Sequence, residues 1–426
     1  MTKITDIPAI RFKGFSDTWE QRKVTEIGKI YIGLVTTMTK HYTDEGTLLI
    51  RNSDIKDGKF EFGDNPIYLE KTFAEKNETR MHQIGDVITV HTGDVGTSAV
   101  ITENEAKSIG FATIVTRPNP KIIDSNYLCS FLNTDKHKKW AVSISTGDGR
   151  TNYNLGDYFE LVVPVPSIAE QKRIASYIQK LNRLITLHQR KYDKLTNVKK
   201  SMLGKMFPQN GSNVPEIRFK GFTEAWEQRK FDEVFDCTIP NNTLSRAELN
   251  YESGSVRNIH YGDILIKYGS VVDVQNDEIP FATGKSSDDF KGALLRDGDI
   301  IIADTAEDET TGKACEIGNS QGLDVVSGLH TMVCRPRNKM ALGYLGYYLN
   351  SDAYHHQLLP LMQGIKVLSL SRTNVQKTMV CYPKSKAEQQ LIADCFRNLD
   401  NLITLHQREL EKLKNLKKAC LEKMFV

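Results

Sequence analysis

The heptapeptide LITLHQR occurs at residues 184–190 and again, letter for letter, at residues 402–408. Each copy contains a histidine, His188 or His406, and imidazole groups can bind metal ions or transfer protons. A metal site or a catalytic pair would also need cysteine or carboxylate partners, which neither copy supplies. We therefore interpret both histidines as structural residues.

Other motifs that suggest chemistry fail on their spacing. The segment ATGKSS (282–287) ends like a phosphate-binding loop, but the glycine required five positions before Gly284 is Ile279. The glycine-rich TGDGRTN (146–152) does not fit the dinucleotide-binding pattern and predicts a polar loop. The seven cysteines form no C-x-x-C pair, which indicates reduced thiols rather than zinc ligands. We predict no catalytic residue, no metal site and no enzymatic activity in this chain.

The composition places the chain among ordinary globular proteins. Its 426 residues exceed the roughly 250–300 at which a single core stops growing, so two or more domains are expected. The net charge of +3 is too small to indicate a nucleic-acid partner by itself, and the basic excess is concentrated in residues 170–206. The sequence shows neither a signal peptide nor a run of roughly 18 apolar residues, so we expect a cytoplasmic protein without a membrane partner.

The chain is an internal tandem repeat. Residues 169–207 align without gaps to residues 387–425, with 22 identities in 39 positions, and residues 7–27 recur at 214–234. Between these repeats the sequences diverge, but landmarks persist: GDVITV and GDIIIA, TIVTRP and TMVCRP, NYLCSFLNT and GYLGYYLNS. This pattern indicates two copies of one fold whose loops have different tasks.

Each long repeat has the signature of one helix. A capping box opens it, Ser167 with Glu170 in the first copy and Ser385 with Glu388 in the second, and no proline follows for about 38 residues. Apolar positions recur in alternating steps of four and three, which predicts a coiled-coil seam. The predicted seam includes Ile178, Leu181, Ile185, His188 and Leu195 in the first helix, and Phe396, Leu399, Ile403, His406 and Leu413 in the second.

An antiparallel pairing would bring the two histidines together at the crossing of the helices. Each helix would be about 55 Å long, enough to hold two domains roughly one DNA turn apart. The expected fold is α+β, with two pseudo-repeated α/β domains separated by two long antiparallel coiled-coil helices. The expected boundaries are residues 1–166 and 208–384 for the domains, and residues 167–207 and 385–426 for the helices.

The order of these motifs resembles the specificity subunit of type I restriction-modification enzymes. The resemblance rests on the openings GFSDTWEQRK (14–23) and GFTEAWEQRK (221–230), and on the closings that contain AEQ at residues 169 and 387. It implies a DNA-reading subunit in which each of two target recognition domains reads half of a bipartite site in double-stranded DNA. It also implies assembly with two methyltransferase (M) subunits and with restriction (R) subunits, which would bind S-adenosylmethionine, ATP and Mg²⁺; no cofactor is expected in this chain.

Residues that read bases should be polar, should lie in loops and should differ between the two copies. The loops before the last strand of each domain fit this description, as do the segments after its first strands. A solvated loop residue remains the alternative for each one. The candidates are Thr36, Thr37, Lys40, His41, Arg150, Asn152 and Asn154 in the first domain, and Asn241, Asn242, Thr243, Arg246, Lys366, Ser369, Arg372 and Asn374 in the second.

Basic residues that are identical in both copies cannot distinguish two half-sites. Arg11, Lys13, Arg22 and Lys23, with their counterparts Arg218, Lys220, Arg229 and Lys230, fit phosphate contacts, a methyltransferase interface or plain surface charge. We expect Trp19 and Trp226 to be packing anchors where each domain meets a helix.

Two other functions remain open on the sequence alone. A coiled-coil scaffold or regulator could use the helices for assembly without reading DNA, and footprinting of the complex would distinguish it because a scaffold gives no bipartite protection. A self-contained nuclease would need a cluster of metal-binding carboxylates, and none stands out in the sequence.

Overall fold

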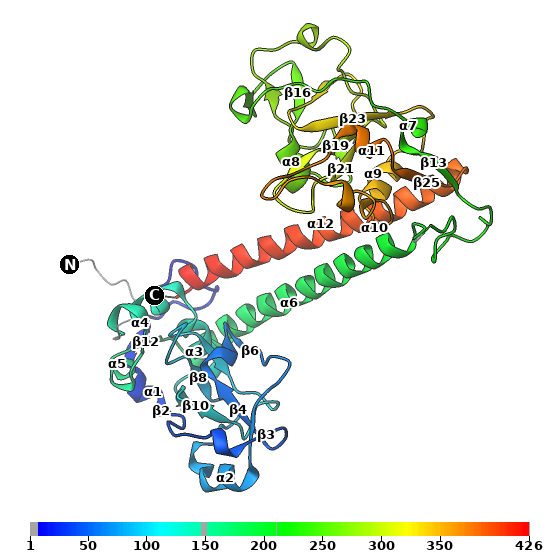
Figure 1. Ribbon diagram of the computed structural model, residues 1–426. Coiled ribbons are helices and arrows are strands. Elements are labelled where there is room, and N and C mark those ends of the chain that lie inside the picture. Colours follow the sequence, from blue (N-terminus) through cyan, green and yellow to red (C-terminus); the bar gives the residue numbers. More distant parts are fainter. Residues whose placement is uncertain (1–6, 146–150, 210, 426) are drawn as a thin grey trace. The chain divides into compact units, whose positions relative to one another are not determined.

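The computed structural model describes residues 7–145, 151–209 and 211–425. The chain divides into two compact units (Figure 1): the first comprises Met1–Gln189 and Arg408–Val426, and the second comprises Arg190–Gln407. Each unit contains one α/β domain together with half of each of two long helices.

The domain of the first unit is built from two four-stranded sheets. One has the order β2-β11-β8-β9 and is antiparallel; the other has the order β10-β4-β7-β3, with β10 parallel to β4. Strand β1 pairs with β12, so the start and the end of the domain lie together. The elements are β1 (Glu20–Lys23), α1 (Val24–Ile27), β2 (Gly28–Ile32), η1 (Thr39–His41), β3 (Tyr42–Thr43), β4 (Thr47–Arg51), η2 (Asn52–Asp54), β5 (Ile55–Lys56), β6 (Lys59–Phe60), β7 (Tyr68–Leu69), α2 (Lys71–Lys76), η3 (Glu78–Arg80), β8 (Val87–Thr89), β9 (Ser98–Val100), β10 (Ile109–Phe111), β11 (Ile114–Pro118), α3 (Ser125–Leu132), α4 (Asp135–Ile144), α5 (Leu155–Phe159) and β12 (Val162–Val165).

The domain of the second unit repeats this plan with more strands. Its main sheet has the order β14-β23-β19-β21-β17, a second sheet has the order β15-β18-β16-β22, and β13 pairs with β25 as β1 pairs with β12. The elements are β13 (Glu227–Lys230), α7 (Phe231–Val234), β14 (Phe235–Asp236), η4 (Arg246–Glu248), β15 (Leu249–Asn250), β16 (Val256–Ile259), α8 (Tyr261–Ile266), β17 (Val271–Asp273), β18 (Phe281–Ala282), η5 (Ser287–Phe290), β19 (Ile300–Ala303), β20 (Thr305–Ala306), β21 (Ala314–Gly318), β22 (Asp324–Ser327), β23 (Thr331–Pro336), α9 (Tyr344–Leu349), α10 (Asp352–His355), η6 (Leu359–Leu361), β24 (Leu368–Ser369), α11 (Arg372–Val375) and β25 (Met379–Tyr382).

The sequence landmarks shared by the two domains form the same ion pair. Arg117, at the end of β11, donates two hydrogen bonds of 2.8 Å to the buried carboxylate of Asp86, which precedes β8. Arg335 makes the corresponding bonds to Asp299, at 2.7 and 2.6 Å. A buried carboxylate needs such a partner. The motifs GD and RP therefore recur because together they hold the centre of each main sheet.

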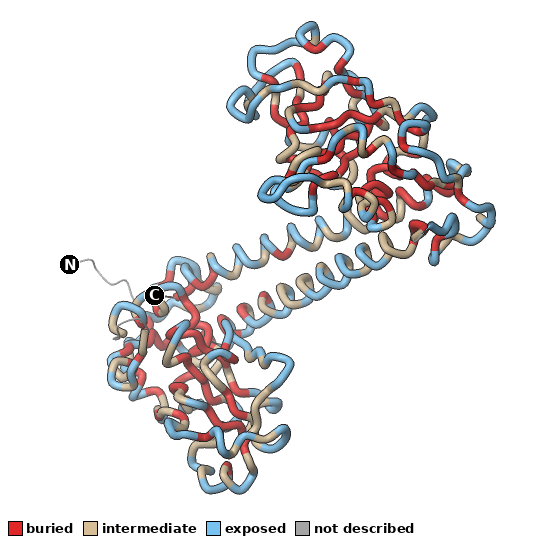
Figure 2. The backbone as a smooth tube through the Cα atoms, viewed as in Figure 1, coloured by how far each residue is buried: buried red, intermediate tan, exposed pale blue. Residues whose placement is uncertain are grey.

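The two long helices are α6 (Ile168–Lys205) and α12 (Lys386–Lys423), each of 38 residues. Exposed and less exposed residues alternate along both (Figure 2), and none of the ten predicted seam residues is exposed. Within the second unit, Lys199 of α6 pairs with Asp400 of α12, and Phe207 stacks on Phe396. Numbers rise along one helix as they fall along the other, so the predicted antiparallel arrangement is confirmed.

The first unit shows the same antiparallel direction. Residues Ile178 and Asn182 of α6 border one small cavity with Lys417 and Leu421 of α12. His188 belongs to the first unit and His406 to the second, and both are half-buried. That the two histidines meet at the crossing stays a prediction.

The lysines on the seam are neutralised differently in the two units. The Lys199 ammonium pairs with Asp400 and lies 5.7 Å from the centre of the Tyr347 ring. Lys417 occupies the equivalent place in α12, but the residue equivalent to Asp400 is Asn182. Its partner is instead Asp57 in the β5–β6 hairpin, at 2.9 Å. The first domain thus supplies the carboxylate that its helix lacks.

Each domain is anchored to the first turn of a long helix by a buried glutamate. Glu170 receives two hydrogen bonds from Arg11, at 2.7 and 2.8 Å, and Glu388 receives the same pair from Arg218, at 2.7 and 2.9 Å. The serine half of each predicted capping box is present, because Ser167 Oγ accepts from the Glu170 amide at 3.4 Å and Ser385 does likewise for Glu388. Arg11 and Arg218 are therefore not plain surface charges, since each is largely buried against the glutamate of the predicted capping box. Phosphate contacts and a methyltransferase interface stay predictions.

The neighbouring glutamine and tryptophan complete each anchor. Gln171 accepts from the Asp124 amide at 2.8 Å, and Gln389 accepts from the Ala341 amide at 3.0 Å. Trp19 and Trp226 are both buried, and Trp226 Nε1 donates to Glu388 at 3.2 Å. The two tryptophans are packing anchors, as the sequence predicted.

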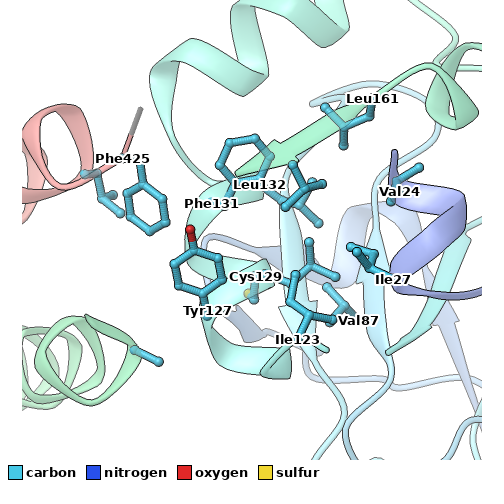
Figure 3. Packing of buried hydrophobic residues seen from close by; sticks show 14 of the residues in the cluster. Val24, Ile27, Val87, Ile123, Tyr127, Cys129, Phe131, Leu132, Leu161 and Phe425 are labelled. Carbon is cyan, nitrogen blue, oxygen red and sulfur yellow. The ribbon is translucent and has the colours of Figure 1, made fainter. Parts of the chain in front are cut away.

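The core of the first unit contains residues from both ends of the chain. Tyr127, Phe131 and Leu132 of α3 lie between Phe425, beyond α12, and residues Val24 and Ile27 of α1 (Figure 3), and the Phe425 ring lies 5.3 Å from the Tyr127 ring. In the second unit Phe207, beyond α6, packs at 6.0 Å against Tyr344, the residue that corresponds to Tyr127. Burial of each such ring is worth roughly 2–3 kcal/mol.

A backbone hydrogen bond closes each unit beside this aromatic residue. The Ile217 amide donates to the Lys205 carbonyl at 2.9 Å, and the Ile10 amide donates to the Lys423 carbonyl at the same distance. In the second unit these partners are close in sequence, whereas in the first they lie at opposite ends of the chain. The same contact thus occurs in both units, although in the first unit it joins the N-terminal and C-terminal segments of the chain.

This equivalence predicts that the chain tolerates circular permutation. Joining Val426 to Met1 leaves seven residues between Phe425 and Ile7, close to the six between Phe207 and Val214. A permutant that begins at Ser212 and ends at Gly211 should therefore fold and keep its melting temperature within a few degrees. Calorimetry would measure this, with a variant truncated after Lys417 as the control that loses the Phe425 contacts. A permutant no more stable than the truncated variant would contradict the prediction.

Candidate nucleic-acid interface

In the first domain the candidates after β2 lie on an exposed segment. Thr36, Thr37 and Lys40 are all exposed. His41 is half-buried: its ring stacks on Phe73 at 4.1 Å, and Nδ1 lies 3.0 Å from Glu70. Three of the four side chains are therefore presented to solvent, while His41 is held by its own domain.

Of the described candidates before α5, one side chain is bonded within the domain and one is exposed. Thr92 Oγ1 donates to Asn152 Oδ1 at 2.9 Å, and the backbones of the same two residues form a β-bridge. Asn154 is exposed at the start of α5. Arg150 lies outside the described residues.

A tight turn over residues 110–113 joins these two groups of candidates. On one side, the Leu34 amide donates to the Gly110 carbonyl at 2.8 Å, next to the segment of Thr36 and Thr37. On the other, Asn52 donates to the Ala112 carbonyl at 3.2 Å and accepts from the His91 amide at 2.8 Å, beside Thr92. The fold thus brings both groups around this turn. Burial lowers the pKa of His91, which favours its neutral form there.

In the second domain Asn242 is a structural residue. Its side chain donates to Asn258 Oδ1 at 2.6 Å and to the Ser327 carbonyl at 2.9 Å, and it accepts from the Leu244 amide at 3.0 Å. Asn241 donates to the Gly328 carbonyl at 3.3 Å, whereas Thr243 is exposed. Two of these three candidates therefore fasten the segment to the turn that follows β22.

Arg246 is only partly available to a ligand. Its guanidinium makes two hydrogen bonds of 2.8 Å to Asp263, which raise the pKa of the arginine, and its side chain is 46% exposed. Nearby His260 is buried; burial first, and then the charge of Arg246, lower its pKa. Asp263 thus holds the Arg246 guanidinium in one position, and the exposed part of that guanidinium remains available to a ligand.

The candidates near α11 begin on a hairpin. Gln363 and Ser369 exchange backbone hydrogen bonds of 3.0 and 2.8 Å, and Lys366 is exposed at the tip between them. Ser369 is also exposed and pairs with Thr305 through strands β20 and β24. Arg372 and Asn374 are half-buried in α11.

The turn over residues 327–330 joins the two groups of the second domain. It receives Asn241 and Asn242 on one side, as described above. On the other side, the Asp304 amide donates to the His330 carbonyl at 3.1 Å, and Thr305 Oγ1 lies 3.5 Å from His330 Nδ1. Thr305 in β20 pairs with Ser369 in β24, which belongs to the hairpin that carries Lys366. The arrangement is the one found around residues 110–113.

The residues of these turns were not among the candidates. Aligning GFATIVTRP (110–118) with GLHTMVCRP (328–336) would have exposed them, because Ala112 and His330 differ between identical glycine and threonine residues. Among the described residues, no group of three or more His, Cys, Asp or Glu side chains could hold a metal ion. No helix in that part of the chain is long and apolar enough to cross a membrane. What converges at each turn is a set of polar side chains of the kind that reads base edges.

Comparison with known proteins identifies the class. The model of the type I restriction modification DNA specificity domain matches residues 16–197 and again residues 223–415. Each match spans one domain and most of the long helix that follows it. The chain belongs to this family: it is a type I restriction-modification specificity subunit with two DNA specificity domains.

Named relatives agree with this assignment. The MjaVIII specificity subunit of Methanocaldococcus jannaschii is 23% identical over 308 residues, which cover 70% of this chain and 68% of the relative. The putative MjaX specificity subunit of the same organism is 22% identical over 439 residues, covering 98% and 93%.

Two solved structures share the fold. The S subunit of a type I system from M. genitalium covers 99% of both chains, with a TM-score of 0.58 and 13% identity. A chain from a study of complex assembly and conformational transition of the type I R-M system has a TM-score of 0.51 and 17% identity, covering 96% of this chain and 98% of the other.

The different roles of Asn242 and Thr243 are testable. Replacing Asn242 by Ala leaves the buried Asn258 Oδ1 without its donor and removes one of the two donors to the Ser327 carbonyl, which keeps the Asn242 backbone amide; we expect a cost of about 1–3 kcal/mol of folding free energy. The Thr243→Ala variant, at an exposed position, should change it by less than about 0.5 kcal/mol. Chemical denaturation of both variants would measure the difference. Equal stabilities would show that Asn242 does not fasten the segment.

Proposed function

We propose that this subunit reads an asymmetric, bipartite site in double-stranded DNA, one half with each domain, and performs no chemistry itself. One observation carries the proposal: a common frame supports different side chains at equivalent loops. The Arg117–Asp86 and Arg335–Asp299 pairs are alike, yet the polar residues around the two turns differ. Two different sets of donors and acceptors imply two different half-sites.

The exposed candidates divide by the contacts that they can make. Thr36, Thr37 and Thr243 are short and suit base edges, whereas Lys40 and Lys366 suit either bases or phosphates. Phosphate contacts orient the subunit on the duplex without selecting a sequence.

The catalytic steps fall to partner subunits in this proposal. Two adenine methyltransferase subunits would bind S-adenosylmethionine, and restriction subunits would use ATP and Mg²⁺. The target adenine must leave the helix to enter a methyltransferase pocket, so this subunit has only to place that pocket over the correct base.

The long helices offer equivalent surfaces for two copies of one partner. Leu184 and Leu187 of α6 are 42% and 46% exposed, and Leu402 and Leu405 of α12 are 44% and 52% exposed. These leucines come from the repeated LITLHQR, in which isoleucine and histidine are less exposed. Identical exposed apolar residues support binding of identical methyltransferase subunits, one to each copy.

Exchange of one domain tests whether each domain reads its own half-site independently of the other. Replacing residues 28–165 by the corresponding segment of another specificity subunit leaves Arg11, Trp19 and Glu170 in place. One half of the methylated sequence should change while the other stays the same. Mapping N6-methyladenine across the genome of a strain that expresses the chimera with its methyltransferase would show this. A change in both halves, or in neither, would refute independent reading.

Lengthening both helices tests their role as a spacer. Seven residues inserted after Gln189 and seven after Gln407 keep the heptad phase and add about 10.5 Å to each helix. The half-sites should stay unchanged while the unread spacer grows by about three base pairs, at 3.4 Å per pair. Insertions of three residues, which disrupt the seam, serve as the control and should abolish methylation. An unchanged spacer with heptad insertions would exclude this role.

A further inference from the structure

The turns at the two candidate interfaces share an unusual backbone conformation. Ala112 has φ of 48° and His330 has φ of 54°, and these residues are equivalent in the alignment of GFATIVTRP with GLHTMVCRP. The left-handed region costs an ordinary L-residue about 1–2 kcal/mol. Alanine has no polar side chain to offset that cost. The conformation has nevertheless been kept in both domains by residues of different type.

Contacts from several segments impose the conformation in the first domain. The Ala112 amide donates to the Leu34 carbonyl at 2.9 Å, and the Gly33 amide donates to the Thr113 carbonyl at 2.8 Å. Asn52 fixes the Ala112 carbonyl, as described above. A side chain on Gly110 would place its Cβ 2.1 Å from Thr113 Oγ1, so the backbone fits there only as glycine.

The second domain imposes the same conformation with other partners. The Gly328 amide donates to the Ile259 carbonyl at 2.8 Å, and the His330 carbonyl accepts from the backbone amide of Asp304. A Cβ on Gly328 would lie 2.8 Å from Asn258 Nδ2. A backbone kept under strain by independent contacts in both domains points to a functional turn.

Within the two turns, GFAT and GLHT, only the position of Ala112 and His330 changes from an apolar to a polar side chain. The His330 side chain is 48% exposed; its ring meets Tyr261 edge to face at 5.3 Å, and Nδ1 lies 3.5 Å from Asp304 Oδ1. Ala112 is half-buried. Both stand where the candidate loops of their own domain converge.

We propose that this position determines sequence specificity: His330 contacts a base pair of the second half-site, and Ala112 is its counterpart in the first. The inference rests on the proposed function, since it requires that these loops face DNA. The neighbouring Asp304 carboxylate favours the tautomer that carries its proton on Nδ1. Nε2 is then an acceptor, which suits the exocyclic amino group of adenine or cytosine in the major groove. The methyl group of Ala112 suits a thymine methyl group instead.

The test compares His330→Ala and His330→Asn in the assembled methyltransferase with wild type. The substrates are duplexes that carry each single base-pair change in the two half-sites. Both variants should lose discrimination at one base pair of the second half-site by about tenfold or more, while the first half-site is read unchanged. Asparagine tolerates the left-handed region, so His330→Asn preserves the turn while it removes the imidazole.

Asn319→Ala is the matched control, because Asn319 also has a positive φ, 58°, but lies between β21 and β22. Its discrimination should equal that of wild type. If both His330 variants discriminate like wild type, the inference is wrong although the proposed function stands. If wild type itself methylates no bipartite sequence, the proposed function fails and the inference fails with it.

Discussion

The buried ion pair at the start of each long helix determines how a domain is mounted. Glu170 and Glu388 are 1% exposed, and each is neutralised by an arginine that lies more than 150 residues away in the sequence. Removing one partner of such a pair typically costs about 3–5 kcal/mol, because a buried charge is left uncompensated. The segment of Arg11 continues into β1, β1 pairs with β12, and β12 leads back to Glu170. The ion pair therefore closes a ring of contacts that fixes the domain on its helix.

Because the domain is fixed on its helix by these contacts, the residues that anchor it are distinct from those in its variable turns. Residues that anchor, such as Arg11, Trp19 and Gln171, recur unchanged in the second copy because the ring of contacts leaves no freedom at those positions. Residues at the far ends of the strands are free to change as long as the turn that carries them keeps its shape. A domain built in this way can acquire a new sequence preference without losing its place on the helix.

The sequence predicted the helices, their seam and the repeat of the fold, because each depends on local periodicity or on identity between the copies. The prediction that the candidates lie in loops was wrong for Ser369, which lies in β24, and for Arg372 and Asn374, which lie in α11. The sequence also did not predict what the candidate side chains contact. Asn242 and Arg246 bond to Asn258 and Asp263, partners that no short-range pattern connects to them. The turn at Ala112 was missed for a related reason, since alanine gives no indication of a positive φ. Contacts from Leu34 and Asn52 impose that conformation.

The two seam lysines show how a repeated helix can still diverge. Lys199 and Lys417 occupy equivalent positions, but the carboxylate partner of Lys199 is Asp400 on the opposing helix, whereas that of Lys417 is Asp57 in a hairpin of the first domain. A lysine side chain that is 14% exposed needs a counter-charge, and the hairpin supplies it where the opposing helix has Asn182. In both copies of the repeated LITLHQR, by contrast, the isoleucine and histidine are half-buried and the leucines are exposed.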